Sequence, residues 1–588
     1  MPAIIDALTD TVSYTYVTAL VVAVASYVLF YRWQLVKTHP DEPPIIPSAI
    51  PFVGHPLGMV LQGGRYVKNL GLCNPDKPIF TLPVPGSRMY IVTDPSLAAA
   101  VQRASKTLSF TPLVPDITRR VLGLDDETVA VVRQHIDPEP GEPRGFLADI
   151  HDLVYSYLGP GEALHELSLG AIQELARRVE DYAERVQKER KGVETVDLLQ
   201  WIRHFVAVAT ANFLYGDENP LALHPELESS FWDFDHGLGS LLMGVLPSLT
   251  APKAYRGREA LAAAFEEYLS KGRHLPGNGR KGASVIVQKR VTIALQHGWT
   301  LQAAARSELS FLFAGIVNTA TTTFWMVLHL FASPTSSTPN LLSTIRSELS
   351  TSFTPDPHTG TLTLSLDSLK ASSPTLQSLL RECLRQNSDT YSTRLVKSPT
   401  TLSGPSGPYH LAADAIVQIS GGTIHADPRI WGPDSAVFNP LRFLPPRRSR
   451  QKKHHHHHHG DDDPAKEEEE APHGNNNKNI HPAAFRAFGG GKTLCPGRHF
   501  ATASIQALVA MLVMGFDITA AADNDADSDG DEEEEGQKQQ QQQNQKGELQ
   551  VPGKEDGVLP VHVLEPKGRV VVMVRVRDLR FIAKVRVV

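Results

Sequence analysis

Residues 488–501 read FGGGKTLCPGRHFA, which places Cys495 between glycines and directly before an apolar helical pattern. A thiolate can be the protein ligand of a haem iron, and it then donates electron density that favours O–O cleavage. Glycines allow the unusual backbone angles and close approach that a tight ligand loop needs, and Pro496 fixes the turn. The stretch therefore favours a thiolate ligand loop, although on composition alone a glycine-rich turn with a buried free cysteine is the commoner case.

The composition is that of an ordinary globular protein. Of its 588 residues, 41% are hydrophobic and 21% charged, and the net charge of −7 is inflated by acidic runs. A chain of this kind offers no basic surface that would indicate a nucleic-acid partner. Three cysteines, at positions 73, 383 and 495, cannot form a disulfide framework, and the sequence has no C-x-x-C pair that would suggest zinc. A reducing compartment fits, and a thiolate ligand also needs one.

An uncharged N-terminal segment runs from Thr11 to Tyr31, between Asp10 and Arg32. Its length is sufficient for one membrane-spanning helix, and aromatic residues lie near both ends, as in interfacial belts. We predict a transmembrane anchor over residues 11–33, with the C-terminal bulk in the cytosol because basic residues follow the segment. A cleaved signal peptide and a buried core helix are the alternatives, but the leader is acidic and a signal peptide normally begins with a basic one.

Proline density and low complexity divide the rest of the chain. Residues 34–56 are proline-rich and predict a stiff hinge. Residues 57–588 then predict one large domain with two low-complexity insertions, 447–479 and 522–557, which lack the apolar residues needed to offset the entropy of ordering. The first insertion contains a run of six histidines that can bind metal weakly; a solvated loop or an internal purification tag explains it more simply.

Helical patterns dominate, with a few strand signals. The strongest helical patterns cover residues 147–186 and 307–330. Two short apolar runs around Pro85-Gly86 predict a hairpin over residues 78–94, and the β-branched end, residues 569–588, predicts further strands. These patterns predict a mainly α fold with small β-sheets, of the α+β class.

The helix predicted over residues 307–330 is apolar except for a polar patch. Gly315, Asn318, Thr319 and Thr322 are spaced to share one face. Glycine permits close approach, and the amide and hydroxyls could hold O₂ or water. Polar groups bonded within the helix are the simpler explanation when this patch is considered alone.

The spacing F-x-x-G-x-x-x-C-x-G favours a thiolate ligand loop over a glycine-rich turn with a buried free cysteine. Phe488, Gly491, Cys495 and Gly497 resemble the haem-binding signature of the cytochrome P-450 family. The resemblance implies the P-450 fold behind a single transmembrane helix, haem b as cofactor, and Cys495 as the ligand of the iron. It makes residues 57–588 a haem-thiolate catalytic domain.

The polar helix resembles the family's distal helix, in which the usual run is A-G-x-(acid)-T. Aligning Ala314 and Gly315 with that run places Val317 at the acid position and Asn318 at the threonine position. Together with Phe324-Trp325, this departure is similar to the branch that contains cholesterol 7-alpha-hydroxylase, prostacyclin synthase and fungal relatives. The resemblance implies that Ala314, Gly315, Asn318 and Thr319 line the oxygen side.

Two further motifs resemble the scaffold around the family's haem. Glu382 and Arg385 match E-x-x-R, and Arg442, in the FNPLRF segment, matches the residue that completes a buried network with them. Lys492 and Arg394 are candidates for binding the haem propionates, because the basic residue often found two before the cysteine is Thr493 here.

The resemblance implies a membrane-anchored monooxygenase that inserts one oxygen atom of O₂ into a lipophilic substrate such as a sterol, fatty acid or secondary metabolite. Electrons would come from an NADPH-dependent flavoprotein reductase, since the chain has no dinucleotide-binding G-x-G-x-x-G segment. The expected location is the endoplasmic reticulum membrane, with the catalytic domain cytosolic. Two alternatives remain at this point: a haem-thiolate isomerase or dehydratase that consumes a peroxide without a reductase, and a non-catalytic membrane protein that binds metals or partners through its loops.

Overall fold

A computed structural model describes residues 2–189, 191–277, 281–332, 340–358, 361–444, 480–521, 549–559, 561–578, 580 and 585–588, with residues 2–15 and 17 described as helical backbone only. The predicted insertion 447–479, including its histidine run, lies outside the described residues, and so do residues 522–548 of the second insertion. Residues 549–557, which that prediction also included, are packed: Leu549 is buried, and Lys554 Nζ donates to the carbonyl oxygen of Gln386 at 2.6 Å.

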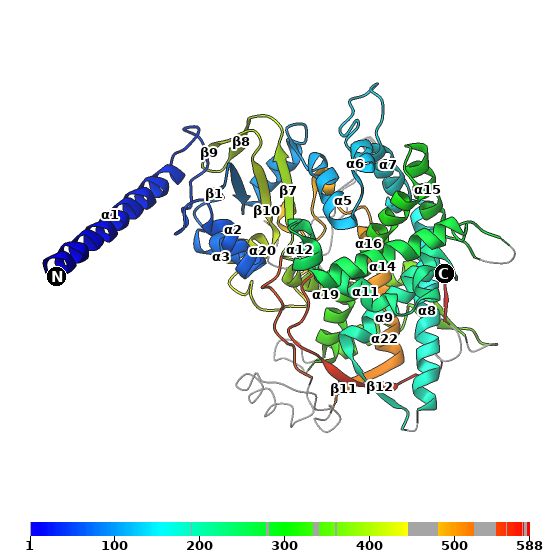
Figure 1. The fold of residues 1–588 in the computed structure, drawn as a ribbon. Coiled ribbons are helices and arrows are strands. Elements are labelled where there is room, and N and C mark those ends of the chain that lie inside the picture. The colour runs from blue at the N-terminus through cyan, green and yellow to red at the C-terminus, as the bar shows by residue number, and fades with distance from the viewer. Residues whose placement is uncertain are drawn as a thin grey trace, which may run out of the picture.

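A sheet-rich part lies beside a larger helical part, and helix α1 (Pro2–Gln34) projects away from the sheet-rich side (Figure 1). The main sheet has the order β1-β2-β10-β7-β3. Its strands, in that order, are Ile79–Val84, Ser87–Val92, Ile416–Ser420, Tyr391–Val396 and Leu108–Ser109. Helices α2 (Gly54–Gln62), α3 (Gly64–Cys73) and α20 (Gly421–Ala426) lie near this sheet.

The predicted hairpin of residues 78–94 is confirmed. Strands β1 and β2 pair in antiparallel register from Ile79↔Val92 to Val84↔Ser87. Gly86 adopts φ +70° in the turn, a conformation that glycine reaches without steric cost.

Smaller sheets tie the C-terminal end of the chain to earlier segments. Strand β12 (Val571–Val576) is the middle strand between β11 (Phe516–Ala520) and β4 (Val193–Asp197). Strand β13 (Val585–Val587) pairs in parallel with β6 (Leu362–Leu364), which pairs with β5 (Phe353–Pro355). The strands predicted near the C-terminus are therefore present. Strands β8 (Thr400–Gly404) and β9 (Gly407–Leu411) form a separate hairpin.

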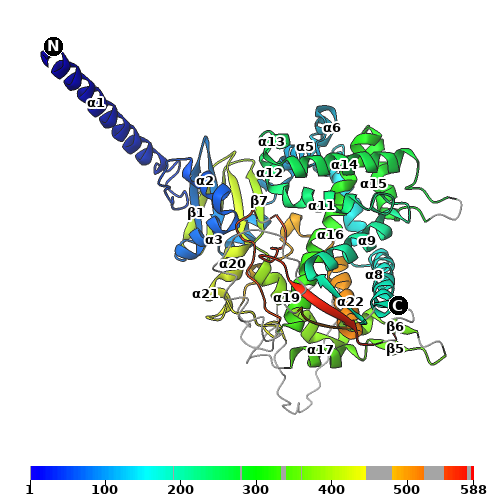
Figure 2. The same cartoon turned by 60° about the horizontal axis from the view of Figure 1, so that its bottom comes forward.

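The helical part is built around α16 (Leu301–Phe331), which is buried along most of its length and packs against α9, α14, α19 and α22 (Figure 2). The other helices, in chain order, are α4 (Pro95–Arg103), α5 (Val114–Leu122), α6 (Asp126–Val132), α7 (Phe146–Leu158), α8 (Glu162–Lys188), α9 (Leu198–Tyr215), α10 (Pro220–Leu223), α11 (Leu227–His236), α12 (Leu238–Met243), α13 (Pro247–Thr250), α14 (Pro252–Ser270), α15 (Val285–Gln296), α17 (Leu341–Leu349), α18 (Leu366–Ser372), α19 (Pro374–Asn387), α21 (Pro428–Trp431) and α22 (Arg498–Gly515). Short 3-10 turns cover Thr111–Leu113, Pro482–Ala484 and Gly491–Thr493.

Two predicted segments differ in detail from the structure. The helical pattern over residues 147–186 is two helices, α7 and α8, because the Gly159-Pro160-Gly161 sequence interrupts it. Proline removes an amide donor and clashes with the preceding turn. The proline-rich residues 34–56 are fixed to the sheet edge, since Thr81 N–H donates to the carbonyl oxygen of Pro44 at 2.8 Å and Ile46 N–H donates to that of Thr81 at 3.0 Å.

Among the residues whose side chains the structure describes, which leaves out residues 2–15 and 17 of α1, only helix α16 has the length and apolarity to cross a membrane, and 72% of its most apolar window is buried inside the protein. Its place in the middle of the helical part identifies it as a core helix.

Candidate active site

Cys495 lies in a tight loop that leads directly into α22. Its N–H donates to the carbonyl oxygen of Phe488 at 2.9 Å, and the N–H of Leu494 donates to that of Gly491 at the same distance. Gly489 and Gly491 have φ of +77° and +61°, in the left-handed region that favours glycine. The backbone therefore closes on itself, and it brings the two ends of the predicted motif together around the cysteine.

The glycines also admit a neighbouring helix. A Cβ atom at Gly490 would overlap the side-chain amide of Gln102, on α4, and one at Gly491 would lie 2.9 Å from the Cβ of the same glutamine. Gly491 thus favours glycine both for close packing against α4 and for its left-handed backbone, whereas the neighbour of Gly490 is the movable end of the Gln102 side chain.

The Cys495 side chain is partly exposed, so its sulfur can be reached. Burial raises the pKa of the thiol, and a bond from the Gly497 N–H and the nearby Arg498 act in the opposite direction. The hydroxyl of Tyr155, on α7, donates to the carbonyl oxygen of Leu494 at 2.6 Å and holds the loop from outside. An accessible thiol with a fixed backbone and an amide donor at the sulfur is suited to a metal-ligand role.

Helix α16 has one accessible side in its middle. Ala314 and Asn318, one turn apart, are exposed, whereas Val317 and Thr319 are buried. Oδ1 of Asn318 accepts from the backbone N–H of Val563 at 2.9 Å. The buried Oγ1 of Thr322 has no hydrogen-bond partner.

The four polar-patch residues do not all share that accessible side. The close approach predicted at Gly315 is made by Thr210 of α9, whose Cγ2 would lie 3.0 Å from an added Cβ. Gly315 and Thr319 line a small cavity together with Phe500 and Ser504 of α22. Because Phe500 follows Cys495 closely in sequence, this cavity places the middle of α16 next to the cysteine loop.

Two buried guanidinium groups lie beside the cysteine loop. Nη2 of Arg394 donates to Oγ1 of Thr493 at 2.6 Å, and Nη2 of Arg486 donates to Oγ of Ser392 at 3.2 Å. With its amide oxygen turned toward Arg486, Gln102 accepts from both terminal nitrogens at 3.0 Å. Burial lowers the pKa of Arg394, and burial followed by repulsion from Arg394 lowers the pKa of Arg486 to about 10.

These two arginines have no carboxylate counterion among the described residues, and the buried Nε of Arg486 has no partner at all. Buried charges are normally paired. The arrangement fits an anionic ligand such as a pair of carboxylates. Lys492, the other predicted propionate candidate, is exposed instead.

A family model described as "Cytochrome P450" matches residues 171–542, which is more than half of the chain. The chain belongs to the cytochrome P450 family. It is a P450 monooxygenase with haem b as its cofactor, and the accessible thiol and the unpaired buried guanidiniums fit that group.

Similar proteins agree with this assignment. Cytochrome P450 monooxygenase nodJ from Hypoxylon pulicicidum is 27% identical over 85% of this chain and 88% of its own length. Cholesterol 7-alpha-monooxygenase from Cricetulus griseus is 24% identical over 49% of this chain and 52% of its own length. Retinoic acid-bound cyanobacterial CYP120A1 has the same fold, with a TM-score of 0.60 over 91% of this chain and 99% of that one, at 17% identity. These relatives agree with the predicted family and with the branch that contains cholesterol 7-alpha-hydroxylase.

The P450 scaffold motifs meet in one buried network. Glu382 accepts from Nε and Nη2 of Arg385 at 2.8 and 2.7 Å, and from Nε of Arg442 at 3.2 Å. Glu382 and Arg385 are both essentially inaccessible to solvent. Arg385 Nη1 donates to the carbonyl oxygen of His425 at 2.6 Å, and so connects the network to α20.

His425 joins that network to the cysteine loop. Its Nε2 accepts from the N–H of Arg486 at 2.8 Å, and its Nδ1 bonds the carbonyl oxygen of Ser388 at 2.9 Å. Burial lowers the pKa of His425 to about 3, so this P450 holds it neutral.

Sequence reasoning missed Arg486, Gln102, His425 and Tyr155. Arg486 carried a signal, because it is a single charge inside the apolar run Phe485-Arg486-Ala487-Phe488. The other three are brought to the loop by α4, α20 and α7, and nothing in their local sequence indicates this.

Proposed function

We propose that this P450 is a membrane-anchored monooxygenase that inserts one oxygen atom of O₂ into a lipophilic substrate, with Cys495 as the iron ligand. One observation carries the proposal: a partly exposed cysteine in a closed loop lies next to the middle of α16, beside two buried guanidiniums that have no carboxylate counterion among the described residues. Haem b with a thiolate ligand supplies the chemistry of O–O cleavage and oxygen transfer.

The chain's own residues hold and surround the cofactor in this proposal. Phe488, Gly491 and Gly497 shape the loop, while Arg394 and Arg486 bind the propionates and exposed Lys492 plays a lesser part. We assign Ala314, Gly315, Asn318 and Thr319 to the oxygen side, since Ala314 and Asn318 are exposed and Gly315 and Thr319 line the cavity shared with Phe500.

Exposed apolar surface on the N-terminal helix supports the membrane anchor. In α1, the side chains of Leu20, Val21 and Leu29 are 60–69% exposed, and the helix stands away from the rest of the protein (Figure 1). Burying such side chains in lipid is favourable. We infer that residues 11–33 span the membrane and that the catalytic domain lies on the cytosolic side of the endoplasmic reticulum.

Names of relatives support a lipophilic substrate. One relative is named for cholesterol, and another, from Homo sapiens, for 7-alpha-hydroxycholest-4-en-3-one; both names denote sterols. A sterol, fatty acid or secondary metabolite would reach the enzyme from the membrane, and an NADPH-dependent flavoprotein reductase would supply electrons.

The test is the reduced carbon monoxide difference spectrum of the purified chain beside a Cys495→Ala variant. We expect the Soret position of a thiolate-ligated haem in the parent and its absence in the variant. A parent spectrum without that band would refute the assignment of Cys495.

Reductase dependence then separates monooxygenation from isomerisation. Turnover of candidate lipids only with NADPH and reductase supports the proposal. Turnover of a peroxide substrate without reductase would overturn it in favour of an isomerase, for which Val317 and Asn318, in place of the usual acid and threonine, are the supporting residues.

A further inference from the structure

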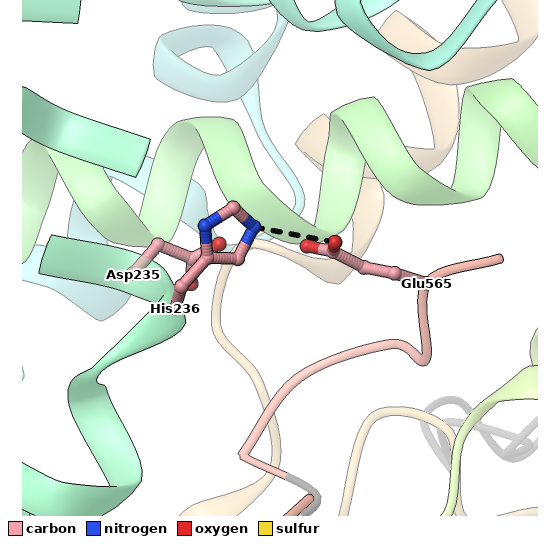
Figure 3. Close-up of side chains that lie close together, drawn as sticks. All are labelled: Asp235, His236 and Glu565. Atoms are coloured by element: carbon pink, nitrogen blue, oxygen red, sulfur yellow. Dashed lines mark ion pairs between the residues drawn. The ribbon is translucent and has the colours of Figure 1, made fainter. Parts of the chain in front are cut away.

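Five charged or titratable side chains meet where the C-terminal segment crosses helix α11. Asp235 and His236 end α11, Arg203 comes from α9, and His562 and Glu565 come from the C-terminal segment. Figure 3 shows Glu565 reaching toward His236 from the opposite side of the cluster.

Two carboxylates form the cluster's contacts between segments. Oε1 of Glu565 accepts from Nη2 of Arg203, and its Oε2 lies 3.4 Å from Nε2 of His236. Oδ1 of Asp235 lies 3.2 Å from Nε2 of His562. The side chain of Asp235 is fully buried, and those of Arg203 and His562 are 2% and 11% exposed.

The nitrogens of His562 both face oxygen atoms. Nδ1 lies 2.9 Å from the carbonyl oxygen of Val563, and Nε2 faces Asp235. Burial raises the pKa of Asp235, and the bond to Glu565 raises the pKa of His236.

The same atoms resemble a divalent-metal site, because ligand atoms of Asp235, His236 and Glu565 lie within 4.8 Å of one another. Arg203 already supplies positive charge there: its Nη2 is also 3.4 Å from Nε2 of His236, and its guanidinium carbon lies 4.2 Å from the centre of the Trp232 ring. A metal ion at this position would meet a fixed like charge.

The cluster is connected to the oxygen side of the proposed site through the C-terminal segment. Between His562 and Glu565, the N–H of Val563 donates to Oδ1 of Asn318, and the carbonyl oxygen of Leu564 accepts from Nε1 of Trp325 at 2.7 Å. The two side chains that bond this segment, Asn318 and Trp325, both belong to α16.

We propose that Arg203, Asp235, His236, His562 and Glu565 form an electrostatic latch that positions Asn318. The latch holds Val563 against α16, so that Oδ1 of Asn318 is occupied and its amide nitrogen is left as the donor on the oxygen side. Asn318 then takes part as a hydrogen-bond donor to water or O₂ at the position where P450 enzymes usually have an alcohol. This inference rests on the proposed function, because it assumes that Asn318 faces bound oxygen.

Hydrogen–deuterium exchange of the Val563 amide in the haem-loaded full chain tests the latch without turnover. Breaking one charged contact with Asp235→Asn or Glu565→Gln should speed that exchange about tenfold, since bonds to charged groups are the stronger ones. Glu228→Gln is the matched control: the exposed His204–Glu228 pair, 2.8 Å apart, joins the same two helices away from the segment. The control should leave Val563 unchanged.

The coupling of NADPH consumption to substrate oxidation tests the consequence for Asn318. Peroxide released per NADPH consumed should rise severalfold in both Asp235→Asn and Asn318→Ala, and remain at the parental value in Glu228→Gln. If a cluster variant loses its carbon monoxide spectrum, His236→Gln is used in its place, because the His236 side chain is half-exposed.

Three results would overturn the latch. These are unchanged Val563 exchange in the cluster variants, faster exchange with unchanged coupling, and slower exchange on adding Zn²⁺, which would make the cluster a metal site. If exchange responds as expected while no lipid is oxidised under any condition, the proposed function fails and the structural latch stands.

Discussion

Replacing Arg486 with methionine should have opposite effects on the haem-free and haem-loaded protein. The buried guanidinium has a pKa lowered to about 10, against an ordinary arginine value of about 12.5. That difference corresponds to about 3 kcal/mol of unfavourable free energy for the charged side chain in the absence of a counterion. The substitution also removes the hydrogen bonds from Arg486 to Ser392 and Gln102, and this loss offsets part of the free energy gained. The free energy of unfolding of haem-free protein should therefore rise by about 1–2 kcal/mol in Arg486→Met.

With haem bound, the same substitution would remove the charge-assisted bond to a propionate that we propose for Arg486. We expect haem to transfer to excess apomyoglobin about tenfold to a hundredfold faster, as the loss of a bond worth about 1.5–3 kcal/mol implies.

Arg258→Met is the matched control. Arg258 is equally buried but paired, with Nη2 2.7 Å from Glu259. Arg258→Met should destabilise the protein with or without haem and leave the rate of haem transfer to apomyoglobin unchanged. Lower stability of haem-free Arg486→Met, or an unchanged rate of haem transfer, would refute the reasoning.

Three further predictions follow from the scaffold and the N-terminus. Glu382→Gln leaves the buried guanidinium of Arg385 without its carboxylate, while Arg442 keeps Asp434, and should cost about 3–5 kcal/mol in chemical unfolding. Glu267→Gln at an exposed pair should not move the midpoint. Burial lowers the pKa of His329 to about 3, below its unfolded value of 6.5, so its contribution to stability is present above pH 6.5 and is lost as pH falls toward 3. His329→Phe should reduce the acid-side slope by up to about 1.4 kcal/mol per pH unit, and an unchanged slope would contradict this. Deleting residues 2–34 should release the enzyme from lipid vesicles in flotation assays with its carbon monoxide spectrum intact; persistent binding would argue against the anchor.

Local motifs could be predicted because their members are fixed by the chain itself. Gly489, Gly491 and Cys495 are within one loop, and Glu382 and Arg385 are one helical turn apart, so spacing alone places them together. The hairpin around Gly86 was predictable for the same reason, since its turn chemistry is local.

Features that depend on helix rotation could not be read from spacing. Gly315 and Asn318 are on adjacent parts of α16, but packing against Thr210 turns Gly315 inward and leaves Asn318 accessible. The interruption at Gly159-Pro160-Gly161 carried a clear local signal within the predicted helical pattern. The partners of Arg486 come from distant segments that only the fold brings together.

The position of β12 has a consequence for synthesis of the chain. This strand lies between β4 and β11, whose residues are made much earlier, so the sheet lacks its middle until residues 571–576 have left the ribosome. Until then β4 and β11 present unpaired edges, which are templates for association with other chains. A message cut short after residue 548 would encode the cysteine loop and most of the core, and yet we expect its product to aggregate during production.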